Sequence, residues 1–269
     1  MFRTRLSALA LAVVAGMGAG CSAGPAPSVP QPTRTTQTAS SPGGTSGTPT
    51  SSAPNPSGSG TAVPACISLS LTGRATLTGS ALGACLVDAA TAAGSGKEKV
   101  TTPSSGIDAR FRYRDSTDVA GTVEGGDGLT EFVLIGRDSY GRLPGGWVRG
   151  DPSSADAEER KVGAAAAAYR RFADPRAALG LVSVVPRWKV RAEQEKVARP
   201  DGTSVPAWRL QSTEGFAVQA FVVSEMVVWL GEDRGVLGLQ AVLGTGDAGE
   251  TVTIAYYDWG LPVQIDRPS

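Results

Sequence analysis

Alternating apolar and polar positions predict that strands make up most of the chain beyond residue 94. The clearest strand is 107–114, in which the apolar side chains occupy every second position: Ile107, Ala109, Phe111 and Tyr113. Because successive side chains of a strand point to opposite faces, this strand has one apolar and one charged face. Apolar runs between turn residues predict further strands at 119–124, 129–135, 139–143, 146–149, 188–197, 205–212, 236–243 and 250–257.

Helical spacing of apolar residues predicts a helix over 78–93, and the alanine run 164–168 predicts a second over 153–172. A capping pattern predicts a third over 175–184. Gly94 and Gly96 end the first helix, Ser153 caps the second, and Asp174 with Pro175 opens the third. The apolar segment 216–229 fits one long strand, two short strands, or a short helix and a strand. Strand pairs at short intervals with a helical insert predict an α+β fold with a large antiparallel sheet.

The first 21 residues have the pattern of an export signal. Arg3 and Arg5 precede an apolar run over 6–17, which is too short to span a bilayer as a helix. The small residues 18–20 and the following Cys21 resemble the lipobox of bacterial lipoproteins, with Gly18 where that motif usually has leucine. The resemblance implies a lipoprotein signal peptide and a diacylglyceryl group, carrying palmitate-type chains, on Cys21. The alternative is an ordinary secretory signal with a chance cysteine.

Residues 22–64 consist almost wholly of Ser, Thr, Pro, Gly and Ala, with one charge, Arg34. Such a segment buries too little apolar surface to offset the entropy of ordering, so we predict a disordered linker. A linker directly after an acylation site holds a folded domain, here 65–269, away from a membrane. We therefore expect an exported protein, anchored by lipid at the outer face of the cytoplasmic membrane or elsewhere in the cell envelope.

Charge and composition narrow the function classes. The chain has 25 basic and 25 acidic residues and no histidine. Arg3, Arg5 and Arg34 lie before the domain, which therefore has a net charge of −3 and no basic excess for nucleic acid. Without histidine the chain lacks the commonest general base and zinc ligand. It also lacks a phosphate-binding Gly-Lys loop and a G-x-S-x-G elbow. We predict no enzymatic activity, cofactor or metal.

Three cysteines are present. If Cys21 is acylated, Cys66 and Cys85 remain as a pair in an oxidising compartment, and a disulfide between them is expected. It would pin the start of the domain to the first helix. The alternative is two buried free thiols.

The order of several short motifs resembles the LppX/LprG-type envelope lipoproteins of actinobacteria and, more distantly, the LolA-like carriers. The motifs lie at 119–124 (VAGTVE), 135–140 (IGRDSY), 144–147 (PGGW), 174–175 (DP) and 256–265 (YYDWGLPVQI). Departures are the very apolar 216–226 and the unmatched 65–79. The resemblance implies a curved antiparallel half-barrel with helices packed on its concave side, enclosing an apolar cavity for acyl chains.

On that fold, alternating apolar residues would line the cavity: Phe111, Tyr113, Phe132, Leu134, Trp188, Trp208, Leu210 and Ile254. The alternative is that they fill an ordinary closed core. The resemblance implies a non-enzymatic carrier of a lipid, glycolipid or other apolar ligand, with a membrane transporter as a partner. The alternative function is a protein-interaction or envelope-sensor domain on the same scaffold, without a ligand cavity.

Overall fold

The structure is a computed structural model that describes residues 64–125, 128–218, 221–244 and 249–269. The predicted signal peptide, the acylation site Cys21 and all but the last residue of the predicted linker lie outside these residues.

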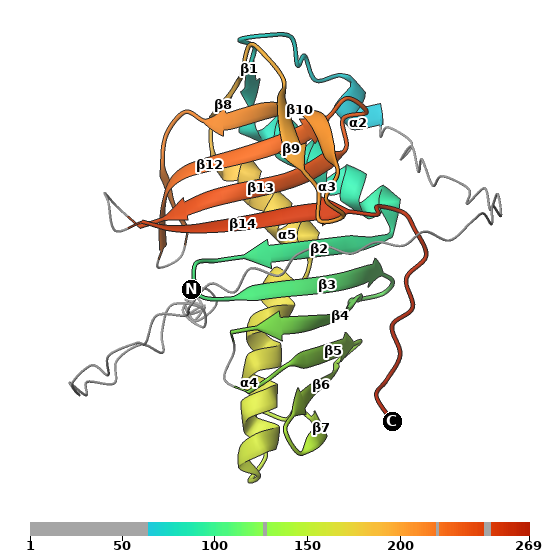
Figure 1. The fold of residues 1–269 in the computed structure, drawn as a ribbon. Helices are drawn as coiled ribbons and strands as arrows, with labels where there is room; N and C mark the ends of the chain where they lie inside the picture. The colour runs from blue at the N-terminus through green and yellow to red at the C-terminus, as the bar shows by residue number, and fades with distance from the viewer. Residues whose placement is uncertain (1–63, 126–127, 219–220, 245–248) are drawn as a thin grey trace, which may run out of the picture. The chain divides into compact units, whose positions relative to one another are not determined.

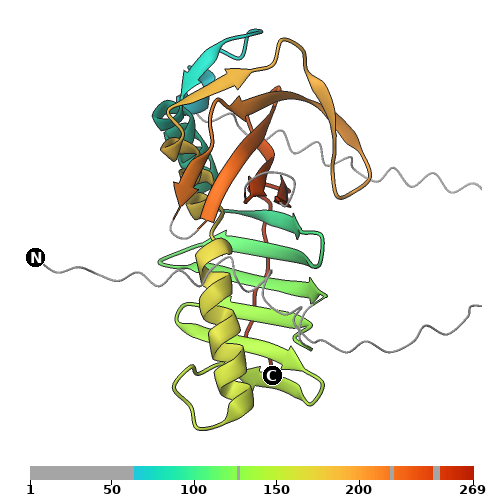
Figure 2. The same cartoon turned by 90° about the vertical axis from the view of Figure 1, so that its left-hand side faces the viewer.

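One antiparallel sheet of 14 strands organises the described part of the chain (Figure 1). From one edge to the other its strands are β1 (Thr76–Thr78), β8 (Arg187–Val190), β10 (Ser204–Ser212), β12 (Phe221–Gly231), β13 (Val236–Leu243), β14 (Glu250–Tyr257), β2 (Ser95–Thr101), β3 (Gly106–Tyr113), β4 (Thr117–Glu124), β5 (Glu131–Ile135), β6 (Asp138–Leu143) and β7 (Gly146–Arg149). Two short strands complete it, since β9 (Glu195–Ala198) pairs with β10 and β11 (Phe216–Val218) pairs with β12. The sheet curves but does not close, and the fold is broadly α+β (Figure 2).

The predicted strands are found, with three differences. The predicted strand 188–197 is two strands, β8 and β9. The apolar segment 216–229 forms two strands, β11 and β12, which was one of the open alternatives. The short edge strand β1 and the central strand β2 were not predicted. In β2 the buried positions are occupied by Gly96 and Glu98, so its pattern does not indicate a strand.

The helices begin and end close to the predicted positions. α3 (Gly79–Ala93) is capped by Thr78 and ends at Gly94, whose φ of 74° suits glycine. α5 (Pro175–Gly180) is capped by Asp174 and continues as a 3-10 turn, η1 (Leu181–Val184). The predicted cap of α4 (Ala157–Phe172) was wrong, because Asp156 accepts hydrogen bonds from the amides of residues 158 and 159. Ser153 instead donates its amide to Asp151, in the turn before the helix.

The helices pack on one face of the sheet, which we call the inner face. α3 places Leu82 and Leu86 in the same core cluster as Leu210 of β10. α4 contacts β5, β6 and β7, and Tyr169 stacks on Phe132 with ring centroids 4.7 Å apart. Gly79 lets α3 approach the loop after η1, because a Cβ there would lie 1.7 Å from the Val185 carbonyl oxygen. Figure 2 shows the helices along one side of the sheet.

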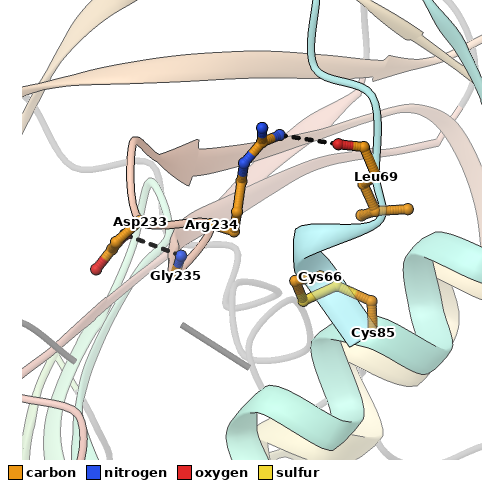
Figure 3. Close-up of a disulfide and its surroundings, with 6 residues drawn as sticks. All are labelled: Cys66, Leu69, Cys85, Asp233, Arg234 and Gly235. Atoms are coloured by element: carbon orange, nitrogen blue, oxygen red, sulfur yellow. Dashed lines mark hydrogen bonds between the residues drawn. A yellow bond between two sulfur atoms is a disulfide. The ribbon is translucent and has the colours of Figure 1, made fainter. Parts of the chain in front are cut away.

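The predicted disulfide joins Cys66 of the short helix α2 (Pro64–Ile67) to Cys85 of α3 (Figure 3). Both cysteines are buried in the inner-face core. Nearby, Arg234 donates a hydrogen bond of 3.0 Å to the Leu69 carbonyl oxygen. The start of the described chain is thus fixed both to α3 and to the turn between β12 and β13.

The opposite, outer face of β3 to β6 is covered by the last residues of the chain, 260–269, which we call the C-terminal tail. Ile265 is 2% exposed and packs with Ala120 and Val133. Arg112 donates a hydrogen bond of 2.9 Å to the Ile265 carbonyl oxygen, and Arg110 one of 2.8 Å to that of Gln264. The tail therefore gives this end of the sheet a second covered face.

Candidate functional site

A carboxyl group is buried on the inner face at the middle of the sheet. Glu98 of β2 is 3% exposed. It lies in register with Tyr256 of β14 on one side and Ala109 of β3 on the other. Gly96, two residues earlier on the same strand, faces the Phe111 ring so closely that a Cβ would lie 2.7 Å from it. Since side chains alternate along a strand, Glu98 also faces inward.

Two tyrosine hydroxyls lie in the same part of the interior. Those of Tyr113 and Tyr256 are buried and have no hydrogen-bond partner among the described residues. The Glu98 carboxyl is buried beside them. We call Glu98, Tyr113 and Tyr256 the interior polar cluster. Buried polar groups are nearly always paired, so two unpaired hydroxyls beside a buried carboxyl are unusual.

Burial determines the protonation of this cluster. It raises the pKa of Glu98 from 4.5 to about 8, with a further contribution from the negative charge of Asp174. Burial also raises the pKa of Tyr113 and that of Tyr256 above the ordinary tyrosine value. At neutral pH all three groups therefore carry their protons, and the cluster presents three O–H donors.

The charged groups beside the cluster are paired with one another. Arg176 donates to both carboxylate oxygens of Asp174, over 2.9 and 2.7 Å, and Thr117 donates a third hydrogen bond of 2.9 Å. Burial alone would raise the pKa of Asp174, but these hydrogen bonds and the Arg176 charge hold it below the usual value. The Arg176 guanidinium also lies 4.2 Å from the centre of the Tyr113 ring. Because Asp174 and Arg176 satisfy each other, neither provides a partner for Glu98.

A hollow of about 310 Å³ opens next to this ion pair. Its lining includes Thr117, Asp174 and Arg176, together with the inner-face residues Val119 and Leu134. The volume is at the lower end of the range for small-molecule sites. The hollow therefore connects the surface at the α4–α5 junction to the apolar inner face, with Arg176 between it and the Tyr113 ring.

The cluster lies where two apolar cores meet. Tyr113 and Trp259 each pack against both cores. The Phe111 ring contacts both of these side chains. Its centroid lies 5.5 Å from that of the Tyr113 ring and 5.3 Å from that of the Trp259 ring. Trp259 also contacts Tyr256, at 5.4 Å. Aromatic rings therefore pack directly beside the polar cluster.

The eight residues predicted to line a cavity all belong to the inner-face cores. One core contains Trp188, Leu210 and Ile254, with Trp208 packed against it. The other contains Phe111, Phe132 and Leu134, and Tyr113 joins the two. Of the eight, Leu134 borders the 310 Å³ hollow and Phe132 borders a second hollow. The alternation thus indicated the correct face, while an acyl-chain cavity lined by these residues stays a prediction.

The second hollow, of about 700 Å³, lies under the C-terminal tail on the outer face. Several of its polar groups pair with one another. Tyr257 donates a hydrogen bond of 3.0 Å to Asp108, and Lys97 forms an ion pair of 3.0 Å with Asp258. Nothing in this groove calls for a further ligand, so the interior polar cluster is the stronger candidate site.

Sequence reasoning missed Glu98, Tyr256 and Arg176. The available signal for Glu98 was its phase, because Gly96, Glu98 and Val100 share one face while Lys97 and Lys99 share the other. Asp174 was predicted as a helix cap. Besides accepting the Arg176 amide as a cap, its carboxylate also pairs with the Arg176 side chain.

Searches against known proteins add no family. No protein-family model matches the chain, and no curated protein matches it. The described residues contain no group of three or more His, Cys, Asp or Glu side chains placed to hold a metal ion. Among the helices of the described residues, none has the length and hydropathy needed to cross a membrane.

Proposed function

We propose that this protein is a membrane-anchored envelope lipoprotein that binds the acyl chains of a lipid or glycolipid on the inner face of its sheet, without catalysing a reaction. One observation carries the proposal. The largely apolar inner face buries the Glu98 carboxyl and leaves the hydroxyls of Tyr113 and Tyr256 without a partner among the described residues, and a hollow that opens to the surface lies at the same face. An unpaired buried polar group costs about 1–3 kcal/mol, so a fold retains such groups where a ligand pairs with them.

The architecture supports the same proposal. A curved, unclosed antiparallel sheet with helices on one face matches what the LppX/LprG resemblance implies. On this proposal the sheet is a half-barrel, and the helices lie on its concave side. The ligand enters between the two cores, at the seam that Tyr113 and Trp259 bridge. The eight predicted residues line its path where the cores separate.

The proposed anchor is the diacylglyceryl group on Cys21, with the linker 22–64 as a tether. A single acyl chain binds a membrane only marginally, whereas two or more give stable attachment. The domain then works at the outer face of the cytoplasmic membrane and exchanges its ligand with a membrane transporter. Incorporation of an alkyne-tagged palmitate should label the wild-type chain and not Cys21→Ser. Equal labelling of both would contradict the anchor.

Native mass spectrometry of the full exported chain tests ligand binding. An affinity tag placed within 22–64 leaves the folded domain unchanged. We expect lipid masses that are present under native conditions and lost on denaturation, whereas covalent acyl groups survive denaturation. If every lipid mass survives denaturation, the binding proposal fails. A protein-interaction role would then be preferred, and a pull-down with and without 216–226 would test it.

A pair of matched variants locates the binding. Ser116 lines the 310 Å³ hollow, whereas Ser204 is exposed at the start of β10. Ser116→Trp should fill the entrance and remove the non-covalent lipid, while Ser204→Trp should keep it. Equal lipid content in the two variants would place the ligand elsewhere.

A further inference from the structure

We propose that the interior polar cluster holds the carbonyl oxygens of an acyl ester, so that the protein selects ester-linked lipids over ether-linked lipids of the same chain length. This inference rests on the proposed function, since it concerns the ligand of the same inner face. It assigns to Glu98, Tyr113 and Tyr256 a role in ligand selection.

The hydrogen-bond donors of the cluster indicate which chemical group of a ligand would bind there. A protonated carboxyl and two phenols present three O–H donors, and the two phenols have no hydrogen-bond partner among the described residues. A pure hydrocarbon would leave these two phenol donors unpaired. An ester carbonyl only accepts hydrogen bonds, so it complements such a set of donors. In a glycerolipid these carbonyls lie between the apolar chains and the polar head, which matches a polar cluster at the border of an apolar face.

Charged ligand groups fit the cluster less well. A carboxylate or phosphate would be buried beside the negative Asp174, and the nearest cation, Arg176, already donates to both oxygens of Asp174. An ammonium group would need Glu98 in its ionised form, and burial together with Asp174 disfavours that form. A neutral acceptor needs no change of charge in the interior.

The cluster lies at the seam between two apolar layers. Glu98 lies on β2, where the strand order passes from β14 to β3, at the junction of the two cores. The hollow reaches the inner face at Val119 and Leu134 and is separated from the Tyr113 ring by Arg176. On this proposal a glycerolipid with its carbonyls at the cluster parts this seam, with one chain toward the hollow and the other along the larger core.

A competition between two lipids tests the inference. The full chain is mixed with an excess of dioleoylglycerol and its dioleyl ether analogue in equal amounts, and native mass spectrometry gives the ratio bound. The wild type should favour the ester about tenfold, which corresponds to one or two hydrogen bonds. Tyr256→Phe and Glu98→Leu should each reduce that preference several-fold without weakening ether binding. Glu98→Gln retains a donor and should keep the preference.

A matched control and a folding check make the outcome decisive. Tyr257 is the next residue of β14, lies on the outer face and is bonded to Asp108, so Tyr257→Phe should leave the preference unchanged. Tyr256→Phe removes an unpaired buried hydroxyl, so this variant should unfold at a temperature no lower than the wild type. Equal binding of ester and ether by the wild type would overturn the inference and leave lipid binding intact. Binding of neither lipid would instead contradict the proposed function.

Discussion

The two halves of the sheet bury their residues in different ways. In the first half, β8, β10, β12, β13 and β14 are covered by α3, α5 and η1, and we call this the disulfide half. Its core is the larger of the two inner-face cores and has the fully buried Trp188 within it. The outer face of β10 and β12 carries polar pairs instead, such as Arg209 with Glu225 at 3.2 Å. This half is stabilised chiefly by a thick apolar layer on its inner face and by a cross-link.

The second half, β3 to β7, is covered on both faces by thinner layers, and we call it the α4 half. On the inner side α4 contributes small residues such as Ala166 and Val162 to two small cores. On the outer side the C-terminal tail places Ile265 against Ala120 and Val133. Stability here depends on two modest layers, of which the outer one has no regular secondary structure.

The two halves differ from the border between them, where buried polar groups lower the stability of the fold. The border between the halves buries the Glu98 carboxyl and leaves the hydroxyls of Tyr113 and Tyr256 without partners, whereas outside it the buried unpaired side-chain atom of the described residues is Arg199 Nε, in the turn between β9 and β10. Leucine or phenylalanine at the three border positions would satisfy the fold at lower cost. A cost concentrated at the seam between two cores is the pattern expected of a site that a ligand completes.

The largest expected effect comes from Trp188→Ala in the disulfide half. Trp188 is 0% exposed and donates a hydrogen bond of 3.1 Å to the Val182 carbonyl oxygen. Loss of its packing should lower the free energy of unfolding by about 4 kcal/mol, measured by urea denaturation. Trp208 is only partly buried at the margin of the same core, so Trp208→Ala should cost clearly less. Equal losses would show that the core is not centred on Trp188.

The next effect tests whether the cross-link stabilises the disulfide half. A bridge spanning 19 residues stabilises by about 3 kcal/mol in the loop-entropy estimate, so Cys66→Ser combined with Cys85→Ser should cost that amount. Hydrogen exchange should quicken in α3 while the amides of β5 and β6 in the α4 half keep their protection until global unfolding. Simultaneous loosening of both halves would contradict their distinction.

The border should make stability depend on pH. Because the pKa of Glu98 is raised from 4.5 to about 8 in the folded state, folding takes up a proton between these values. Stability is therefore complete below about pH 4.5 and falls as the pH rises toward 8. At 1.36 kcal/mol per pKa unit, the free energy of unfolding should drop by about 2 kcal/mol between about pH 5.5 and about pH 7.

Glu98→Gln should remove that slope. The pKa of Asp174 is lowered, so its own titration affects stability only at more acidic pH. A slope that persists in Glu98→Gln would mean that another group titrates in this window.

The sequence predicted some of the elements that these experiments concern and missed others. Strand 107–114 was predicted because its apolar residues alternate, and the Asp174–Pro175 start of α5 because capping is a local property. The disulfide followed from counting cysteines. Strand β2 was missed because its inward positions include Gly96 and Glu98, which are not core-type residues. Glycine is needed at position 96 because the Phe111 ring lies against it. Phe111 belongs to a different strand, β3, so the local sequence of β2 does not reveal this need.

The interior polar cluster could not be predicted for a related reason. Its members are separated by up to 158 positions, from Glu98 to Tyr256, and meet only because β14 pairs with β2. That pairing joins strands from opposite ends of the domain, and no local pattern encodes it. Sequence alone therefore indicated the inner face correctly but gave no sign of the polar groups on it.

The smallest expected effect concerns the outer layer of the α4 half. Ile265 is 2% exposed, and its carbonyl oxygen accepts the 2.9 Å hydrogen bond from Arg112. Ile265→Val removes one methylene and should lower the free energy of unfolding by about 1 kcal/mol. Leu261 of the same tail is 41% exposed, so Leu261→Val should change stability by less than half as much. If Ile265→Val proves neutral while Trp188→Ala is severe, the tail is a loosely held cover and the α4 half relies on its inner layer alone.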